Sequence, residues 1–347
     1  MNHPLIRSMT VMLVCLGGLS CGQARQVEVH DPVMIREGGT YYVFSTGPGI
    51  TIYASDDLER WRWIGRAFEG EPNWAQDVAP GFNGHLWAPD VFEKDGRYYL
   101  YYSVSAFGRN TSGIGVTVNE TLDPESPDYR WVDHGMVVQS VPNRDDWNAI
   151  DPAIVADEDG NHWISFGSFW SGIRLVKLDD GLVRLAEPQE WRSIARRPRE
   201  VATPDDEPGG GSVEAPYIFR KGDWYYLFVS FDLCCRGMNS SYKIMVGRSK
   251  SVTGPYVDRD GTPMLEGGGT LVLEGNDNWV ALGHNAAYTF DGRDWLIFHA
   301  YETADDGQQK LRIVPMGWDD GWPVVEPDDL DRFTTELVGE GPPENDD

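Results

Sequence analysis

Short segments rich in aromatic and β-branched residues recur along the chain, and turn residues separate them. In one copy, the apolar run 150–155 contains the pair Asp151-Pro152, turns at Asp159-Gly160 and continues into the aromatic segment 162–166. Apolar runs of four to eight residues bounded by glycine, proline or aspartate are typical of β-strands. Comparable aromatic segments lie at 41–45, 98–103, 162–166, 224–228 and 295–298.

These segments are regularly spaced. Aligning Tyr42, Tyr99, Trp163, Tyr226 and Trp295 gives steps of 57, 64, 63 and 69 residues. A repeat of this length, containing several short strands and turns, indicates a β-propeller blade. The 347-residue chain is therefore predicted to be all-β, with a single-domain, five-bladed β-propeller over residues 25–335. A leader (1–24) precedes the propeller, and an acidic tail (336–347) follows it.

An acid before a proline marks where some of these units begin. Proline has no N–H for a sheet ladder and favours an extended residue before it, so it suits the first position of a strand. Asp31, Asp151 and Glu214 are therefore predicted to stand in register where innermost strands begin, at one mouth of the central channel. The fifth unit carries His284 at this place and lacks the proline.

The net charge of the chain limits the kinds of molecule that it can bind. The chain has 29 basic and 55 acidic residues, a net charge of −26. Such a charge repels nucleic acid and anionic lipid surfaces, so no nucleic-acid partner is expected.

The N-terminus predicts export. Arg7 and the apolar run 11–16 are typical of a secretory signal, and the run is too short to span a membrane. Cleavage after the small residues near Ala24 predicts a soluble secreted protein. Cleavage before Cys21 predicts a lipoprotein on the outer surface or in the periplasm.

Cys15 and Cys21 lie in the leader, so the predicted propeller contains only Cys234 and Cys235, and no long-range disulfide framework is expected. Their neighbouring positions leave open two free thiols or a local bridge.

Three acids at one mouth suit the hydrolysis of a glycosidic bond. One carboxyl protonates the leaving oxygen, and a second activates water or attacks the sugar. A third carboxylate raises the pKa of the member that must keep its proton. The alternative is that the acids only tie neighbouring blades together through hydrogen bonds.

The chain resembles glycoside hydrolase family 43, and within it the endo-1,5-α-L-arabinanases, over nearly all of its predicted mature length. The resemblance is carried by motifs at 30–32, 87–90, 102–108, 147–152, 165–172, 213–216, 232–237 and 283–285. It implies inverting endo-hydrolysis of arabinan in the breakdown of plant cell walls. Asp31 matches the general base, Glu214 the general acid, and Asp151 the carboxylate that orients the acid and tunes its pKa.

The resemblance also implies sugar contacts and a metal. A metal, usually calcium, would lie in the central channel, held by His284 and water. The implied contacts with arabinan or arabino-oligosaccharides are Asp31, Trp87, Phe107, Gly113, Asn148, Ala149, Ile150, Asp151, Ser168, Phe169 and Trp170.

Two other functions are compatible with this pattern. One is an exo-acting arabinofuranosidase or β-xylosidase of the same family, and the long irregular segment 187–211 leaves the substrate length open. The other is a non-catalytic carbohydrate-binding propeller. The sequence indicates no oligomeric state.

Overall fold

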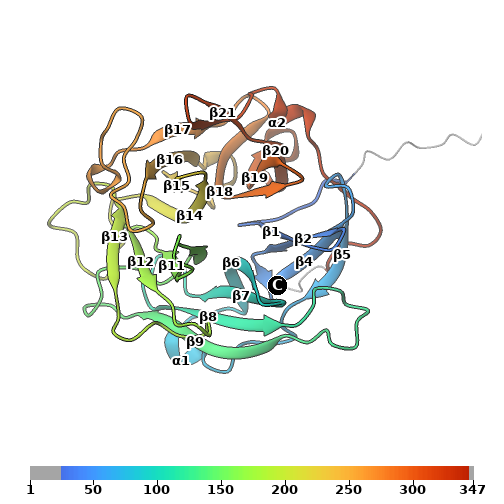
Figure 1. Ribbon diagram of the computed structural model, residues 1–347, viewed down its shortest axis with the longest axis horizontal. Helices are drawn as coiled ribbons and strands as arrows, with labels where there is room; N and C mark the ends of the chain where they lie inside the picture. Colours follow the sequence, from blue (N-terminus) through green and yellow to red (C-terminus); the bar gives the residue numbers. More distant parts are fainter. Residues whose placement is uncertain (1–24, 344–347) are drawn as a thin grey trace, which may run out of the picture.

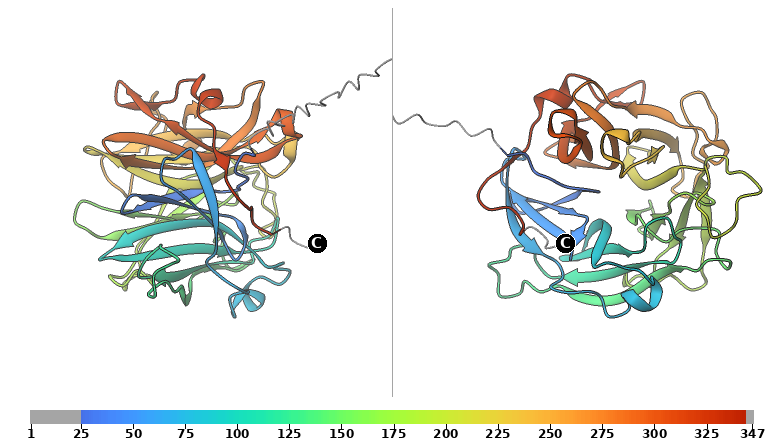
Figure 2. Two further views of the ribbon diagram at one scale, coloured as in Figure 1. Left: turned by 90° about the vertical axis from the view of Figure 1, so that its right-hand side faces the viewer. Right: turned by 180° about the vertical axis from the view of Figure 1, so that it is seen from behind.

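The computed structural model describes residues 25–343. The predicted leader, including Cys21, and the last four residues of the predicted tail lie outside this range. Five sheets surround a central axis, which confirms the five-bladed β-propeller (Figure 1). Seen from behind, the same five sheets enclose the same axis (Figure 2).

We number the blades 1 to 5 in chain order. Each is an antiparallel meander whose first strand lies nearest the axis. Blade 1 contains β1 (Val33–Glu37), β2 (Thr40–Ser45), β4 (Thr51–Ser55) and β5 (Arg60–Arg66). Blade 2 contains β6 (His85–Lys94), β7 (Arg97–Val104), β8 (Ser112–Asn119) and β9 (Val132–Ser140), and the short β3 (Gly47–Pro48), which follows β2 in the chain, pairs with the start of β6. Blade 3 contains β10 (Ala153–Ala156), β11 (His162–Phe166), β12 (Ile173–Lys177) and β13 (Trp191–Ala195).

The last two blades follow the same plan. Blade 4 contains β14 (Val213–Lys221), β15 (Trp224–Phe231), β16 (Lys243–Ser249) and β17 (Thr270–Leu273). Blade 5 contains β18 (Trp279–Phe290), β19 (Arg293–Glu302) and β20 (Gln308–Pro315). A separate hairpin, β21 (Gly317–Asp319) and β22 (Trp322–Val324), follows it. The short helices are α1 (Ala75–Val78), α2 (Asp329–Arg332), η1 (Gly237–Asn239), η2 (Met264–Glu266) and η3 (Thr303–Asp305).

The predicted aromatic segments form the second strand of each blade, and both faces of these strands are buried. One aromatic residue of each segment is fully buried: Phe44, Tyr101, Phe166, Phe228 and Phe298. Because each sheet packs between two neighbouring blades, its strands carry apolar residues on both faces instead of alternating with polar ones. This packing supplies the core.

The predicted Asp-Gly turns join the first and second strands. The φ values are 55° and 75° in Asp95-Gly96, and 51° and 77° in Asp291-Gly292. Two consecutive positive φ values are typical of the type I′ hairpin turn, and an aspartate followed by glycine tolerates them best.

The ends of the described chain close the ring. The amide of Leu311 in β20 donates to the carbonyl of Val27 at 2.8 Å, so the N-terminal segment lies along the last blade. β23 (Glu336–Leu337) pairs in parallel with β5 of blade 1. Figure 2 shows this C-terminal segment beside blade 1. The first two residues of the predicted acidic tail therefore belong to the propeller, because they satisfy the backbone of an edge strand.

Within the described residues, no helix has the length and apolar character needed to cross a membrane.

Candidate active site

Each blade contributes one residue to a ring at one mouth of the channel, and the five residues occupy equivalent positions in the repeat. Their φ values are all positive, which is rare for residues other than glycine. They are Asp31 (51°), Ala88 (45°), Asp151 (61°), Ala215 (54°) and His284 (51°). The expectation of an extended residue before each proline is therefore wrong.

Contacts between blades explain this conformation. A side chain of the preceding blade accepts the backbone N–H of every residue in the ring. The acceptors are His299 Nδ1 for Asp31 (3.2 Å), Thr46 Oγ1 for Ala88 (2.8 Å), Ser103 Oγ for Asp151 (3.1 Å), Asp151 Oδ2 for Ala215 (3.1 Å) and Ser230 Oγ for His284 (2.8 Å). Unfavourable backbone conformations of this kind cost about 1–3 kcal/mol each and persist where surrounding contacts hold them.

The ring also corrects the predicted register. Ala215, and not Glu214, occupies the position of Asp31 and Asp151, so Glu214 lies one residue earlier, inside β14. The pairing of β14 with β15 shifts between Glu214 and Tyr217. Glu214 is nevertheless buried, and its charge interacts with those of Asp31 and His284, so the three acids still share one mouth.

Asp31 is surrounded by hydrogen-bond donors. Its Oδ1 lies 2.8 Å from Nδ1 of His30 and 3.0 Å from Nδ1 of His284, and its Oδ2 accepts the hydroxyl of Thr46 at 2.6 Å. Burial would raise the pKa of Asp31, but the charges and hydrogen bonds of His284 and His30 outweigh it and hold the pKa well below its usual value. Asp31 is therefore a carboxylate at neutral pH, as a general base must be.

Glu214 and Asp151 differ from Asp31 because their surroundings raise the pKa of both carboxyls. Glu214 Oε2 accepts the hydroxyl of Ser168 at 2.5 Å, and Oε1 accepts that of Tyr242. Burial raises the pKa of both Glu214 and Asp151, and the mutual repulsion of their charges raises the pKa of Asp151 further. Such a pair titrates as a unit and keeps one proton to higher pH than an exposed carboxyl.

Several groups that hold these acids were not predicted from the amino-acid sequence. Tyr242 and His299 carried no signal, because neither belongs to the repeated motif. His30 belongs to the motif at 30–32, but no role was predicted for it; its ring stacks on that of His299, with the two centroids 4.0 Å apart. Burial lowers the pKa of His299 well below its usual value, so His299 is a neutral acceptor at this mouth.

The predicted aromatic contacts lie in different environments. Phe107 is 78% exposed and Trp87 is half-buried, so both rings are accessible. Trp170 is only 3% exposed, and its Nε1 donates to the carbonyl of Asp205 at 2.8 Å. The Trp170 ring therefore packs under the segment 196–212. Neighbouring Phe169 has a φ of 55° and is half-buried.

The other predicted contacts are mostly buried. Asn148 accepts the hydroxyl of Ser112 at 2.7 Å, and the amide of Ala149 donates to Ser140 at 2.9 Å. Ile150 is 8% exposed. Gly113 is buried in β8, where a Cβ would lie 3.0 Å from the ring of Trp74. The role of these residues in sugar binding stays a prediction.

The two adjacent cysteines form a disulfide. Cys234 and Cys235 are bonded to each other, which resolves the alternatives that the sequence left open. Cys235 Sγ lies 3.7 Å from Nε2 of His30, and its backbone N–H donates to the hydroxyl of Tyr301 at 2.8 Å. The disulfide therefore borders the histidine that contacts Asp31.

The environment of His284 fits the metal that the resemblance implies. A metal-bound histidine usually donates its other ring N–H to a carboxylate, and here Nδ1 faces Asp31. This contact fixes the tautomer that leaves the Nε2 lone pair for a cation. His284 belongs to neither of the three-residue groups of possible ligands within residues 25–343, so water would complete the coordination. Without a cation, burial lowers the pKa of His284, but Asp31 outweighs it and raises the pKa to about 9.

Comparisons with known proteins agree with this geometry. The family model described as "Glycosyl hydrolases family 43" matches residues 25–323. A protein of Cellvibrio japonicus, named extracellular exo-α-(1→5)-L-arabinofuranosidase, is 57% identical over 97% of this chain and 99% of its own length. A Bacillus subtilis protein, named extracellular endo-α-(1→5)-L-arabinanase 1, is 42% identical over 85% of this chain and 87% of its own. The solved structure of Cellvibrio cellulosa α-L-arabinanase complexed with arabinohexaose is 59% identical, with a TM-score of 0.89 over 90% of this chain and 100% of that one.

Proposed function

The chain belongs to glycoside hydrolase family 43, and from this premise we propose that it hydrolyses α-1,5-linked L-arabinofuranosyl chains of arabinan with inversion of configuration. Its membership makes it an enzyme rather than a non-catalytic binding propeller. The observation that carries the proposal is one mouth where three carboxyls are buried together: the histidines around Asp31 lower its pKa, and burial raises the pKa of both Asp151 and Glu214.

Each carboxyl has a distinct proposed role. Asp31 takes a proton from the water that attacks the anomeric carbon, while Glu214 gives a proton to the departing glycosidic oxygen. Asp151 repels negative charge on Glu214 and thereby keeps the acid protonated. Asp151 also accepts the N–H of Ala215, so it fixes the backbone beside Glu214. The acids thus tie blades together as well, which was the alternative that the sequence left open.

We propose that the enzyme acts from chain ends. The relative with 57% identity carries an exo name, whereas the one with 42% carries an endo name. The segment 196–212 covers Trp170 beside the mouth, and Arg197 anchors it through an ion pair with Asp232 at 2.6 Å. A segment in this place is suited to closing one end of the substrate groove. The second candidate is endo cleavage, which the predicted motifs around Asn148 and Ser168 favour.

Digestion of debranched arabinan tests the reaction and separates the two candidates. An exo enzyme releases one short product from the start while viscosity falls slowly. Product chromatography and viscometry on the same samples measure both, with the Glu214→Gln variant as the inactive control. Early loss of viscosity together with a ladder of oligosaccharides would establish the endo candidate instead. No release of arabinose or arabino-oligosaccharides would overturn the proposed function.

We further propose that His284 holds a calcium ion together with water. Such a cation would offset the negative charge of the buried acids and fix water near them. Export is supported by the extracellular names of both relatives. A lipid anchor on Cys21 remains a prediction about residues outside the described part of the chain.

Chelation is expected to lower the melting temperature of the wild-type enzyme by roughly 5 °C, because a ligand that binds only the folded state stabilises it by mass action. His284→Ala should abolish this response to chelator, whereas His134→Ala, at an exposed histidine of β9, should keep it. Differential scanning calorimetry with and without added calcium measures the response. The substitution alone also removes the contact with Asp31, so only the difference made by the chelator bears on the metal. Equal melting temperatures with and without chelator in the wild type would refute the calcium site.

A further inference from the structure

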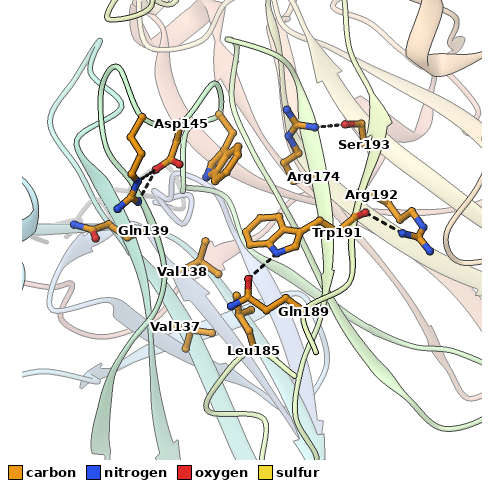
Figure 3. Close-up of a pocket in the computed structure, with 12 residues that line it drawn as sticks. Val137, Val138, Gln139, Asp145, Arg174, Leu185, Gln189, Trp191, Arg192 and Ser193 are labelled. Carbon is orange, nitrogen blue, oxygen red and sulfur yellow. Dashed lines mark hydrogen bonds and ion pairs between the residues drawn. The ribbon is translucent and has the colours of Figure 1, made fainter. Parts of the chain in front are cut away.

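A hollow lies on the outer wall of the propeller, between blades 2 and 3. It has a volume of about 490 Å³, within the range of small-molecule sites. Gln139 at the end of β9 forms one side, and Arg174 of β12 with Trp191 of β13 forms the other (Figure 3). None of the three catalytic carboxyls lines it. We call this hollow the blade 2–3 groove.

Trp191 gives the groove a rigid apolar surface. Its ring centroid lies 5.2 Å from that of Trp147 and 6.0 Å from that of Phe166. Its Nε1 donates to Oε1 of Gln189 at 3.0 Å, which fixes the ring orientation (Figure 3). A half-buried tryptophan held in this way offers an apolar face and loses little side-chain entropy on binding.

Each positive charge in the lining is compensated by a neighbouring acid. Three arginines line the groove, and each is paired with an acid. The pairs are Arg144 with Asp145 at 2.6 Å, Arg174 with Asp146 at 2.8 Å and Arg192 with Glu190 at 2.7 Å. Because their charges are already compensated, these guanidinium groups attract a polyanion weakly. Their remaining N–H groups and the amide of Gln139 suit hydroxyl groups.

From this combination we propose that the blade 2–3 groove is a second carbohydrate site, which binds a neutral pentose chain. A tryptophan face beside hydroxyl-binding amide and guanidinium groups matches a sugar with one apolar and one polar side. The proposal rests on the proposed function, which makes α-1,5-arabinan the chain to be held.

The groove and the mouth share one loop. Trp147 lines the groove, and the next residue, Asn148, is a predicted sugar contact at the mouth. The backbone N–H of Ser171, next to Trp170, donates to the carbonyl of Asp146 at 3.0 Å. This hydrogen bond joins the loop that contains Trp147 to the segment that contains Trp170, another predicted sugar contact. A polymer bound in the groove is thereby kept near the mouth, which raises the local concentration of chain segments there. Short substrates gain nothing from such a site.

Native affinity electrophoresis in gels containing debranched arabinan tests the groove. The parent protein carries Glu214→Gln, so the polymer is not digested. Trp191→Ala is expected to weaken retention about tenfold, a loss typical of removing an aromatic binding surface. A double variant at partly exposed positions, Gln139→Ala with Arg192→Ala, should weaken it without removing core packing. Trp63→Ala, at a tryptophan of the outer strand β5 in blade 1, is the matched control and should be retained like the parent.

Kinetics complete the test in the active enzyme. The groove variants should raise KM for arabinan and leave hydrolysis of an aryl arabinoside or arabinotriose unchanged. Unchanged retention in both groove variants would overturn the proposal, as would stronger retention by polygalacturonate than by arabinan. Failure of the wild type to cleave arabinan at all would refute the proposed function instead, so the two failures are distinguishable.

Discussion

Asp31→Asn is expected to slow arabinan hydrolysis by about 10²- to 10⁴-fold or more, with KM largely unchanged. The amide cannot take a proton from water, although it keeps the size of the carboxylate and the contact with Thr46. The loss should be the same for substrates with good and poor leaving groups, because activation of water is needed for both. Steady-state rates on arabinan and on an activated aryl arabinoside measure it, and Asp291→Asn at an exposed turn is the control.

Two further results would contradict this role. One is a large decrease in the melting temperature of Asp31→Asn, because the slower rate would then reflect damage to the ring of interblade contacts. The other is retention of anomeric configuration in the first product of the wild type, observed by proton NMR of fresh hydrolysate. Retention would mean a covalent intermediate on Asp31 or Asp151 in place of a single displacement.

Glu214→Gln is expected to cost a similar factor, about 10²- to 10⁴-fold, on arabinan, but to recover much of its rate on an activated aryl arabinoside. A leaving group that departs as a stable anion needs little protonation, so the missing acid matters less. Rates across a series of aryl leaving groups measure this dependence. Equal losses on all substrates would contradict the assignment of Glu214 as the acid.

The pH profile separates Asp151 from Glu214. Burial raises the pKa of both Asp151 and Glu214, and repulsion between their charges couples them, so activity should be lost at high pH when the pair releases its proton. Asp151→Asn removes one of these two charges, so it should lower the pKa of Glu214 and move the basic limb of kcat/KM to lower pH. The acid limb belongs to Asp31, whose pKa is held low, and should stay nearly in place. If the basic limb does not move, Asp151 does not set the pKa of Glu214, and its role is the structural contact with the backbone N–H of Ala215.

The amino-acid sequence by itself determined the architecture. Aromatic segments at intervals of about 60 residues predict five blades, and turns such as Asp95-Gly96 join their strands as expected. This information is local, because a short run of apolar residues marks a strand that will be buried on both faces, and the residues of a turn select its backbone conformation. The three acids were identified from the same repeat and from the family resemblance that the comparisons confirm.

Only the tertiary structure decided how the acids are held. Glu214 lies one residue before the position of Asp31 and Asp151, and the positive φ of each residue in the ring depends on an acceptor in the preceding blade. Asp31 and His299 are 268 positions apart in the chain, so no periodicity relates them. The pKa values of the acids likewise follow from burial and from charges brought together by ring closure. These contacts join distant segments, and a repeat of about 60 residues specifies each blade but not the side chains that meet between blades.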